Sequence, residues 1–106
     1  MAVDTIEVKE LFDLYESSGP LEVIDVRTPE EYNEVHATIV SKHIPLDQFE
    51  PSSLAGVEGK MLYFICKSGG RSMQAATLAE EAGFKCTNVE GGTMAWAALG
   101  LPTKNG

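Results

Sequence analysis

The sequence is poor in cysteine, in positive charge and in long apolar runs, and each shortage excludes a class of protein. Two cysteines in 106 residues are too few for a disulfide framework, and a metal site would need more cysteine or histidine ligands at short spacing. Eight basic residues against 16 acidic ones give a net charge of −8, which argues against nucleic acid or an anionic membrane surface as the main partner. The chain begins without a signal-peptide pattern and contains no transmembrane-length apolar run. We therefore expect a cytoplasmic protein, in a reducing compartment that preserves free thiols.

The length and the order of the sequence patterns predict one α/β domain. The chain of 106 residues suits a single domain, here expected over 1–106 with its core at about 4–102. Short β-branched or apolar runs alternate with segments of helical spacing, which is typical of parallel βαβ units in a three-layer domain. Strands are expected at 4–7, 21–26, 39–44, 61–65 and 86–89, and helices after Val8, after Thr28, over about 72–82 and after Gly92. Residues 46–57 read as irregular or briefly helical.

The most informative segment is Cys-Lys-Ser-Gly-Gly-Arg-Ser at positions 66–72. It follows the apolar run at 61–65 and precedes a predicted helix, so Cys66 falls between the end of a strand and a helix N-terminus. Free N–H groups and the positive end of the helix dipole favour a thiolate there, as do the nearby cations Lys67 and Arg71. The loop also resembles an anion cradle of converging backbone N–H groups. A reactive thiol is favoured over the alternative, a small buried hydrophobic residue.

Several further motifs accompany this loop in a fixed order. They are the segments 23–32, with Asp25 and Arg27, 66–72, 75–78, Gly83-Phe84, 89–92, Ala95-Trp96 and 100–102. Together they resemble the single-domain rhodanese family of thiosulfate sulfurtransferase-like proteins. The resemblance implies a central, mainly parallel five-stranded sheet flanked by helices, with Cys66 as the nucleophile at the base of the loop. The segment 35–43 departs from the family pattern, because the usual glycines are missing around His36, and this alters one wall of the substrate approach.

The chemistry implied by the resemblance is covalent sulfur transfer. Cys66 would attack the outer sulfur of a small anionic donor such as thiosulfate, and the resulting persulfide would pass its sulfur to a thiol, cyanide or a protein acceptor. Loop N–H groups would stabilise the terminal sulfur, as an oxyanion hole stabilises oxygen. Neither a metal nor an organic cofactor is required. The sequence leaves the physiological donor, the acceptor and the oligomeric state open.

Each residue of the loop has an expected role and an alternative. Lys67 would attract the donor or be a solvated lysine, and Arg71 would either point into the cradle or brace the loop through a carboxylate. Ser68 and Ser72 can donate hydrogen bonds to the persulfide, although Ser72 is favoured as the N-cap of the next helix. Gly69 and Gly70 allow backbone geometry that a Cβ would resist.

The residues singled out beyond the loop are expected to have mainly structural roles. Asp25 and Arg27 are expected to form a buried ionic network that fixes the loops, with Glu31 as a further partner of Arg27, rather than to face the site. Cys86 reads as a structural cysteine rather than a resolving thiol. Trp96 is expected to pack the last helix against the sheet, and His36 and His43 lack companions for a metal site.

Three other functions remain as alternatives. A cysteine-dependent phosphatase of related architecture is disfavoured because Cys66 and Arg71 are separated by four residues, whereas such phosphatases use Cys-x5-Arg. A non-catalytic binding module is disfavoured because the cysteine and its cations are present. A persulfide carrier that delivers sulfur to a protein acceptor would use the same Cys66 chemistry, and the sequence does not separate it from a thiosulfate enzyme.

Overall fold

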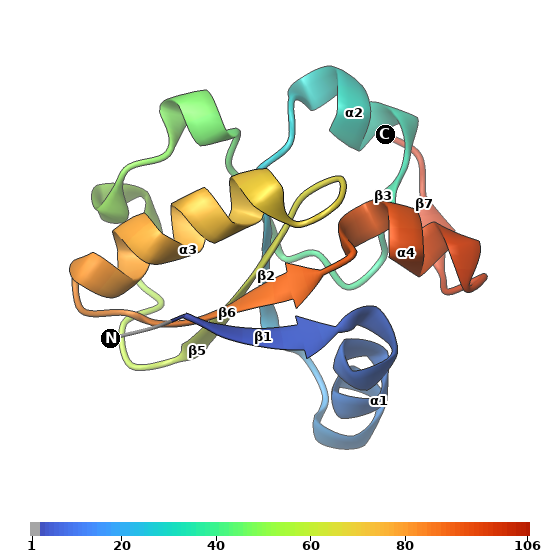
Figure 1. Cartoon of the computed structure of the whole chain (residues 1–106), viewed down its shortest axis with the longest axis horizontal. Coiled ribbons are helices and arrows are strands. Elements are labelled where there is room, and N and C mark those ends of the chain that lie inside the picture. The colour runs from blue at the N-terminus through green and yellow to red at the C-terminus, as the bar shows by residue number, and fades with distance from the viewer. Residues whose placement is uncertain (1–2) are drawn as a thin grey trace.

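The protein is built on one parallel sheet with helices on both faces (Figure 1). The computed structural model describes residues 3–106; Met1 and Ala2, which the single-domain prediction included, lie outside the described residues. The strand order is β1-β6-β5-β2-β4, and all neighbours pair in parallel. These strands are β1 (Asp4–Glu7), β2 (Glu22–Asp25), β4 (Lys42–His43), β5 (Met61–Ile65) and β6 (Lys85–Glu90). The predicted five-stranded α/β architecture is confirmed.

Helices form the two outer layers. They are α1 (Val8–Ser18), α2 (Pro29–Glu34), α3 (Gly70–Glu81) and α4 (Gly92–Ala98), with short 3₁₀ segments at η1 (Leu46–Gln48) and η2 (Pro51–Leu54). In Figure 1, α3 and the 3₁₀ segments cover one face of the sheet, and α1 lies on the opposite side together with α4. In residues 3–106 no helix has the length and apolar character needed to cross a membrane.

The central strand β5 supplies side chains to both cores. Leu62 and Phe64 join the cluster under α3, whereas Tyr63 and Ile65 join the cluster under α1 and α4. This alternation follows from the pleat, which points successive side chains to opposite faces. It explains why β5 is a continuous apolar run, since a parallel strand covered by helices is buried on both sides. Each fully buried side chain of this size contributes about 1.5–3 kcal/mol through the hydrophobic effect.

Local signals set most helix boundaries. Thr28 caps α2 through a capping box with Glu31, and Pro29 occupies the first helical position, as the sequence predicts. At the end of α3, Gly83 has a positive φ of 99° and donates its N–H to Glu80, which is the expected role of a C-terminal glycine. The start of α3 differs from the prediction, because the helix begins at Gly70 rather than near Ser72.

Two short strands were not predicted. β3 (His36–Ala37) and β7 (Thr103–Lys104) pair antiparallel, and the predicted strand at 39–44 shrinks to the two residues of β4. Strands of two residues carry no readable alternation, and the partner of β3 lies at the far end of the sequence. The pairing brings the chain end beside α2, as Figure 1 shows.

The parallel topology brings the carboxyl ends of the strands to one edge. Asp25, at the end of β2, is in register with Ile65, at the end of β5. The next residues, Val26 and Cys66, therefore leave the sheet side by side, and the Val26 N–H donates to the Ile65 carbonyl at 3.1 Å. Ligand sites of open α/β sheets form at this edge.

Candidate active site

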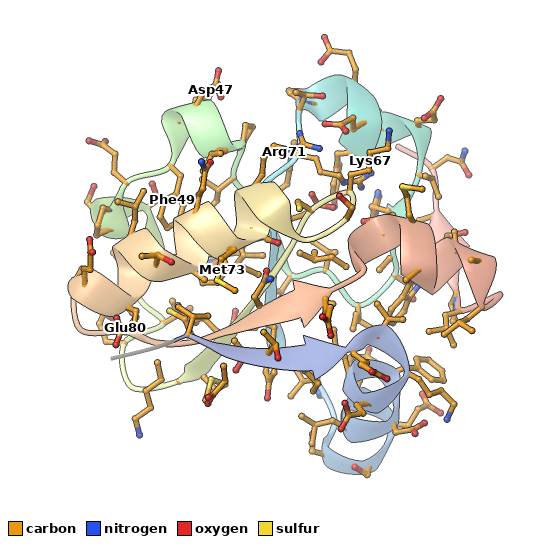
Figure 2. The ribbon with its side chains drawn as sticks, viewed as in Figure 1. Asp47, Phe49, Lys67, Arg71, Met73 and Glu80 are labelled. Atoms are coloured by element: carbon orange, nitrogen blue, oxygen red, sulfur yellow. The ribbon has the colours of Figure 1, made fainter. Side chains whose placement is uncertain are left out.

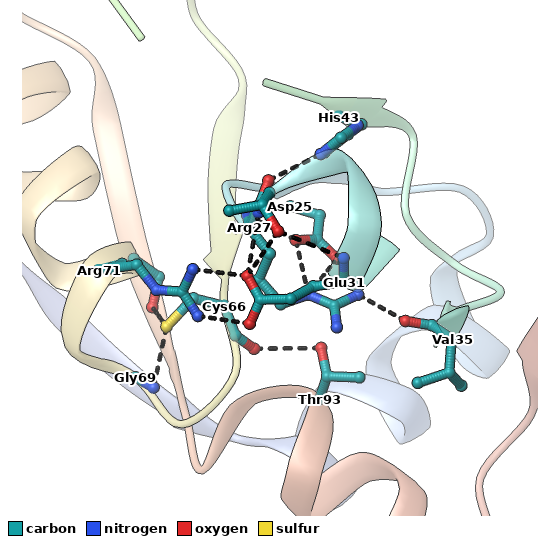
Figure 3. Close-up of polar contacts among 11 residues, drawn as sticks. Asp25, Arg27, Glu31, Val35, His43, Cys66, Gly69, Arg71 and Thr93 are labelled. Carbon is teal, nitrogen blue, oxygen red and sulfur yellow. Dashed lines mark hydrogen bonds and ion pairs between the residues drawn. The ribbon is translucent and has the colours of Figure 1, made fainter. Parts of the chain in front are cut away.

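The sulfur of Cys66 lies at the base of the loop and accepts hydrogen bonds from it. The N–H of Gly69 donates to Cys66 Sγ at 3.0 Å (Figure 3). The Ser72 hydroxyl approaches the same sulfur at 3.3 Å. Gly69 has φ of 118°, a left-handed conformation that lets the loop close over the sulfur and start α3 at the next residue. The residue Cys66 is only 1% exposed, so these groups act where water competes little.

The polar surroundings favour the thiolate despite burial. Burial raises the pKa of the Cys66 thiol, but the Ser72 hydroxyl and the N–H groups of Ser72, Gly69 and Ser68 together lower that pKa below its ordinary value. Among residues 3–106 no donor bonds to the Cys86 sulfur, and burial together with the charge of Glu80 raises its pKa to about 11. The two cysteines are both free and buried, yet only Cys66 has the environment of a nucleophile.

The prediction that Ser72 caps α3 is wrong. Gly69 is the N-cap, and Ser72 is the third residue of the helix, with its side chain turned inward. Its hydroxyl lies 2.5 Å from Asn88 Oδ1 as well as near the Cys66 sulfur. A hydroxyl carries one proton, so Ser72 shares it between the amide oxygen and the sulfur.

Asn88 is a site residue that the sequence analysis missed. Its Nδ2 donates to the carbonyl of Gly69 at 3.1 Å, which fixes the amide so that Oδ1 faces Ser72. Asn88 thus ties the loop and the helix to β6. The sequence contained a signal for this role, because asparagine is disfavoured in strands. A buried asparagine in β6 also needs a hydrogen-bond partner, which points to a contact with another element.

The N-terminus of α4 supports the loop from the other side. The backbone N–H of Thr93 donates to the Cys66 carbonyl at 2.8 Å, its hydroxyl donates to the same oxygen at 3.1 Å, and the Met94 N–H donates to the Lys67 carbonyl at 3.0 Å. The C=O and N–H of a planar trans peptide point in opposite directions. Holding these carbonyls toward α4 therefore turns the N–H groups of Lys67 and Ser68 away from α4. Sequence patterns gave no indication of this contact.

Arg71 braces the loop. Its guanidinium donates to both carboxylate oxygens of Glu31, at 2.7 and 2.9 Å, and so connects α3 to the first turn of α2. The Arg71 hydrogen bonds, joined by those from Thr28 and opposed by burial, lower the pKa of Glu31 to about 2. Of the two roles left open for Arg71, the structure places it in the bracing one. The expectation that Glu31 would pair with Arg27 is wrong, because Arg71 holds both of its oxygens.

Arg27 pairs with Asp25 instead, as expected. Arg27 Nε and Nη2 contact the Asp25 carboxylate at 2.8–3.1 Å, and both residues are buried. Arg27 also donates to the Val35 carbonyl at 2.7 Å, so the atypical segment 35–43 is tied to the site by its first residue. Tyr32 of α2 stacks between His36 and His43 of this segment, with its ring centroid 3.8 and 4.2 Å from theirs.

A pocket of about 240 Å³ opens beside the loop. Charged side chains of both signs and an exposed methionine line it: Arg27, Glu31, Glu34, Lys67 and Met94, with Val35, Thr93 and Ala97. Lys67 is exposed, and Figure 2 shows Lys67 and Arg71 on the side of the molecule where α2 lies. Ser68 and Gly70 are also exposed on the loop.

The remaining predicted residues lie away from this pocket. Trp96 is fully buried, packs edge-on against Phe12 and donates to the Pro102 carbonyl at 2.7 Å, so it anchors α4 as expected. Within residues 3–106, no group of three or more histidine, cysteine, aspartate or glutamate side chains is arranged to hold a metal ion.

The parallel sheet and the N–H cradle around Cys66 at its carboxyl edge place the protein in the class of α/β proteins with a cysteine site. Comparison of the chain with known proteins identifies its family. The model of the rhodanese-like domain matches residues 7–99, and the chain belongs to this family. The Bacillus subtilis protein named "Putative sulfurtransferase YtwF" is 36% identical over 96 residues, covering 91% of this chain and 92% of that protein. Thiosulfate sulfurtransferase 16 of Arabidopsis thaliana is 36% identical over 94 residues, covering 76% of this chain and 78% of that protein.

Another sequence relative and a solved structure are also similar to this chain. The uncharacterized protein slr1261 of Synechocystis is 36% identical over 100 residues; the match covers 93% of this chain but only 55% of that protein. The crystal structure of a rhodanese-like domain protein from Staphylococcus aureus has a TM-score of 0.81 at 33% identity, covering 89% of this chain and 91% of that one. Two of these relatives carry sulfurtransferase in their names, YtwF as a "Putative sulfurtransferase", which supports a sulfurtransferase activity for this chain.

Proposed function

We propose that this protein transfers sulfane sulfur from thiosulfate or a persulfide donor to a thiophilic acceptor through a persulfide on Cys66. The observation that carries the proposal is the convergence of the Gly69 N–H and the Ser72 hydroxyl on a buried sulfur whose pKa is lowered. The same groups suit the terminal sulfur of a persulfide, which is also an anion. The names of the relatives support sulfur as the transferred atom.

The proposed cycle has two displacements. The Cys66 thiolate attacks the outer sulfur of thiosulfate, the S–S bond of the donor breaks, and its electron pair leaves with sulfite. Cys66 then carries S–S⁻. An acceptor (cyanide, a thiol or a protein) attacks the outer sulfur, and the electron pair of the Cys66 S–S bond returns to Cys66 as the thiolate. Ping-pong kinetics should follow.

The setting and the partners form part of the proposal. Two free cysteines suit a reducing, cytoplasmic compartment, and the net charge of −8 argues against nucleic acid or an anionic membrane as partner. A persulfide carrier with a protein acceptor would use the same cradle. The phosphatase alternative is weakened, since the Arg71 guanidinium that would bind phosphate oxygens is engaged by Glu31.

The test is the intact mass of the purified protein after incubation with thiosulfate and then with cyanide. We expect a gain of about one sulfur atom that maps to Cys66 and disappears with cyanide. Cys66→Ser should abolish the adduct, and the matched Cys86→Ser variant should retain it. An unreactive Cys66 that gains no sulfur from thiosulfate or from a persulfide would contradict the proposal.

A further inference from the structure

The cations around the Cys66 cradle are mostly engaged by carboxylates. Arg27 is held by Asp25 at 2.8 Å, with both side chains almost fully buried, and Arg71 is held by Glu31 at 2.7 Å. In the described part of the chain, Lys67 is the cation of the loop that has no ion pair, and it is exposed. Glu31 and Glu34 line the same pocket as Lys67. The approach to the sulfur is therefore rich in N–H donors but poor in free positive charge.

Arg71 is a cation of the loop whose charge reaches the Cys66 sulfur although its guanidinium is engaged by Glu31. Figure 3 shows its guanidinium pointing toward the Glu31 carboxylate, and its charge interacts with the Cys66 thiolate. The two nitrogens Nη1 and Nη2 each bind one oxygen of Glu31. This bidentate arrangement is the one a guanidinium uses for the oxygens of sulfate-like or phosphate-like ions. Glu31 thus occupies the position that an oxyanion would take.

The two donor classes differ in what they need from this region. Thiosulfate is a dianion, and its oxygens leave as part of sulfite. Negative charge therefore develops on the sulfite oxygens during the reaction, where a nearby cation would stabilise it. A persulfide, RS–S⁻, carries its charge on the sulfur that is transferred. The protonated form RS–SH reacts: the Cys66 thiolate attacks its outer sulfur, the S–S bond breaks, and the electron pair leaves on the inner sulfur. The leaving thiolate takes up the proton of the transferred sulfur, which gives RSH and the Cys66–S–S⁻ anion. That sulfur can be stabilised by the N–H groups of the loop without a free guanidinium.

Resting on the proposed sulfur transfer at Cys66, we propose that Glu31 determines donor specificity. By occupying both nitrogens of the Arg71 guanidinium, it disfavours oxyanion donors such as thiosulfate and leaves persulfides as the preferred donor class. Glu31 is a specificity-determining residue that acts through Arg71. Thr28 holds it in place, because the Thr28 N–H donates to Glu31 Oε1 at 3.0 Å and its hydroxyl does so at 3.1 Å. The same carboxylate therefore caps α2 and neutralises Arg71.

The test compares kcat/KM for thiosulfate and for cysteine persulfide in the unaltered protein and in Glu31→Gln. In the unaltered protein we expect the persulfide to be the better donor by about tenfold or more, which is the scale of one charge-assisted hydrogen bond. Glu31→Gln should shift the ratio toward thiosulfate by about tenfold. Glutamine still suits a capping box, so α2 should keep its start. The matched control is Glu30→Gln, which removes the same charge from the same helix turn without touching Arg71 and should leave the ratio unchanged.

Two further measurements separate the possible failures. In the Glu31→Gln/Arg71→Gln double variant, the increase in kcat/KM for thiosulfate should disappear, because that increase depends on the freed guanidinium of Arg71. In a Cys66→Ser background, which transfers no sulfur, calorimetry should show tighter thiosulfate binding after Glu31→Gln. Equal efficiency of the two donors in the unaltered protein, or an unchanged ratio in Glu31→Gln, would overturn this inference while leaving the persulfide on Cys66 intact. Absence of any Cys66 adduct from either donor would instead remove the proposed function itself.

Discussion

Thr93 holds the carbonyl of Cys66 with two hydrogen bonds, one from its backbone N–H at 2.8 Å and one from its hydroxyl at 3.1 Å. The nucleophile is thereby fixed by a residue 27 positions away. Together with Asn88 on Gly69 and Glu31 on Arg71, this contact supports the loop from three separate elements. The cradle is therefore formed before any substrate arrives, which reduces the reorganisation needed during the reaction.

The close approach of α4 to the loop depends on Gly92. A Cβ at this position would lie 2.5 Å from the Cys66 carbonyl oxygen and 2.6 Å from the Lys67 carbonyl, and Gly92 has φ of 59°. Gly92→Ala should therefore destabilise the protein by about 2–4 kcal/mol in urea unfolding, since backbone must move. The control is Gly100→Ala, where φ is 73° but nothing lies within 4 Å of the added carbon. If Gly92→Ala lowered the free energy of unfolding by no more than the ~1 kcal/mol expected for Gly100→Ala, the close approach at Gly92 would not matter for stability.

The buried pair of Asp25 and Arg27 should be costly to break. Asp25→Asn leaves the Arg27 guanidinium buried without its counter-charge, and we expect a loss of about 3–5 kcal/mol in chemical denaturation. The matched surface pair is Lys9 and Asp13, with side chains 63% and 60% exposed. Asp13→Asn should cost only about 0.5 kcal/mol. Similar losses in the two variants would show that burial does not set the strength of the inner pair.

The two cysteines should differ in the pH at which they react. In Cys86→Ser, which retains Cys66, alkylation by iodoacetamide should have a midpoint below the usual range for a thiol, because hydrogen bonds lower the Cys66 pKa. In Cys66→Ser, which retains Cys86, the midpoint should lie near the raised pKa of about 11. Adding Ser72→Ala to the Cys86→Ser variant should raise the Cys66 midpoint, since the thiolate loses a donor. A midpoint that falls or does not move would rule out Ser72 as a stabilising group.

The ion pair of Arg71 and Glu31 should make part of the stability depend on pH. The pKa of Glu31 is lowered from 4.5 to about 2 in the folded protein, so its contribution is complete above the unfolded value and is lost as the pH falls through about 2. Because the two side chains are 35% and 29% exposed, we expect a contribution of about 1–2 kcal/mol near pH 7.

Urea unfolding of the unaltered protein and of Glu31→Gln checks this sign. The stability difference between them should be constant above about pH 5 and should shrink progressively below that value. Glu30→Gln again serves as the control, because Glu30 makes no side-chain hydrogen bond or ion pair within residues 3–106. A difference that grows on acidification would mean that Glu31 is stabilised in its protonated form, contrary to the pairing seen here.

The sequence by itself determined the elements that depend on local patterns. The apolar run at 61–65, the Thr28-Pro29 helix start and the Gly83 helix end each follow from neighbouring residues, and each was predicted. The segment 66–72 showed that a cysteine would meet N–H donors, because a strand followed by glycines and a helix produces them wherever it occurs.

Only the tertiary structure decided the partners of the charged and polar groups. Nothing in the local sequence distinguishes Arg27 from Arg71 as the partner of Glu31, since the choice depends on how α2 and α3 meet above the sheet edge. The contacts of Asn88 with Gly69 and of Thr93 with Cys66 likewise join positions 19 and 27 residues apart. The positive φ of Gly69 was also decided by the tertiary structure. It lets α3 begin at Gly70, two residues earlier than predicted, and turns Ser72 inward. Such contacts are set by the packing of distant elements, and no local periodicity encodes them.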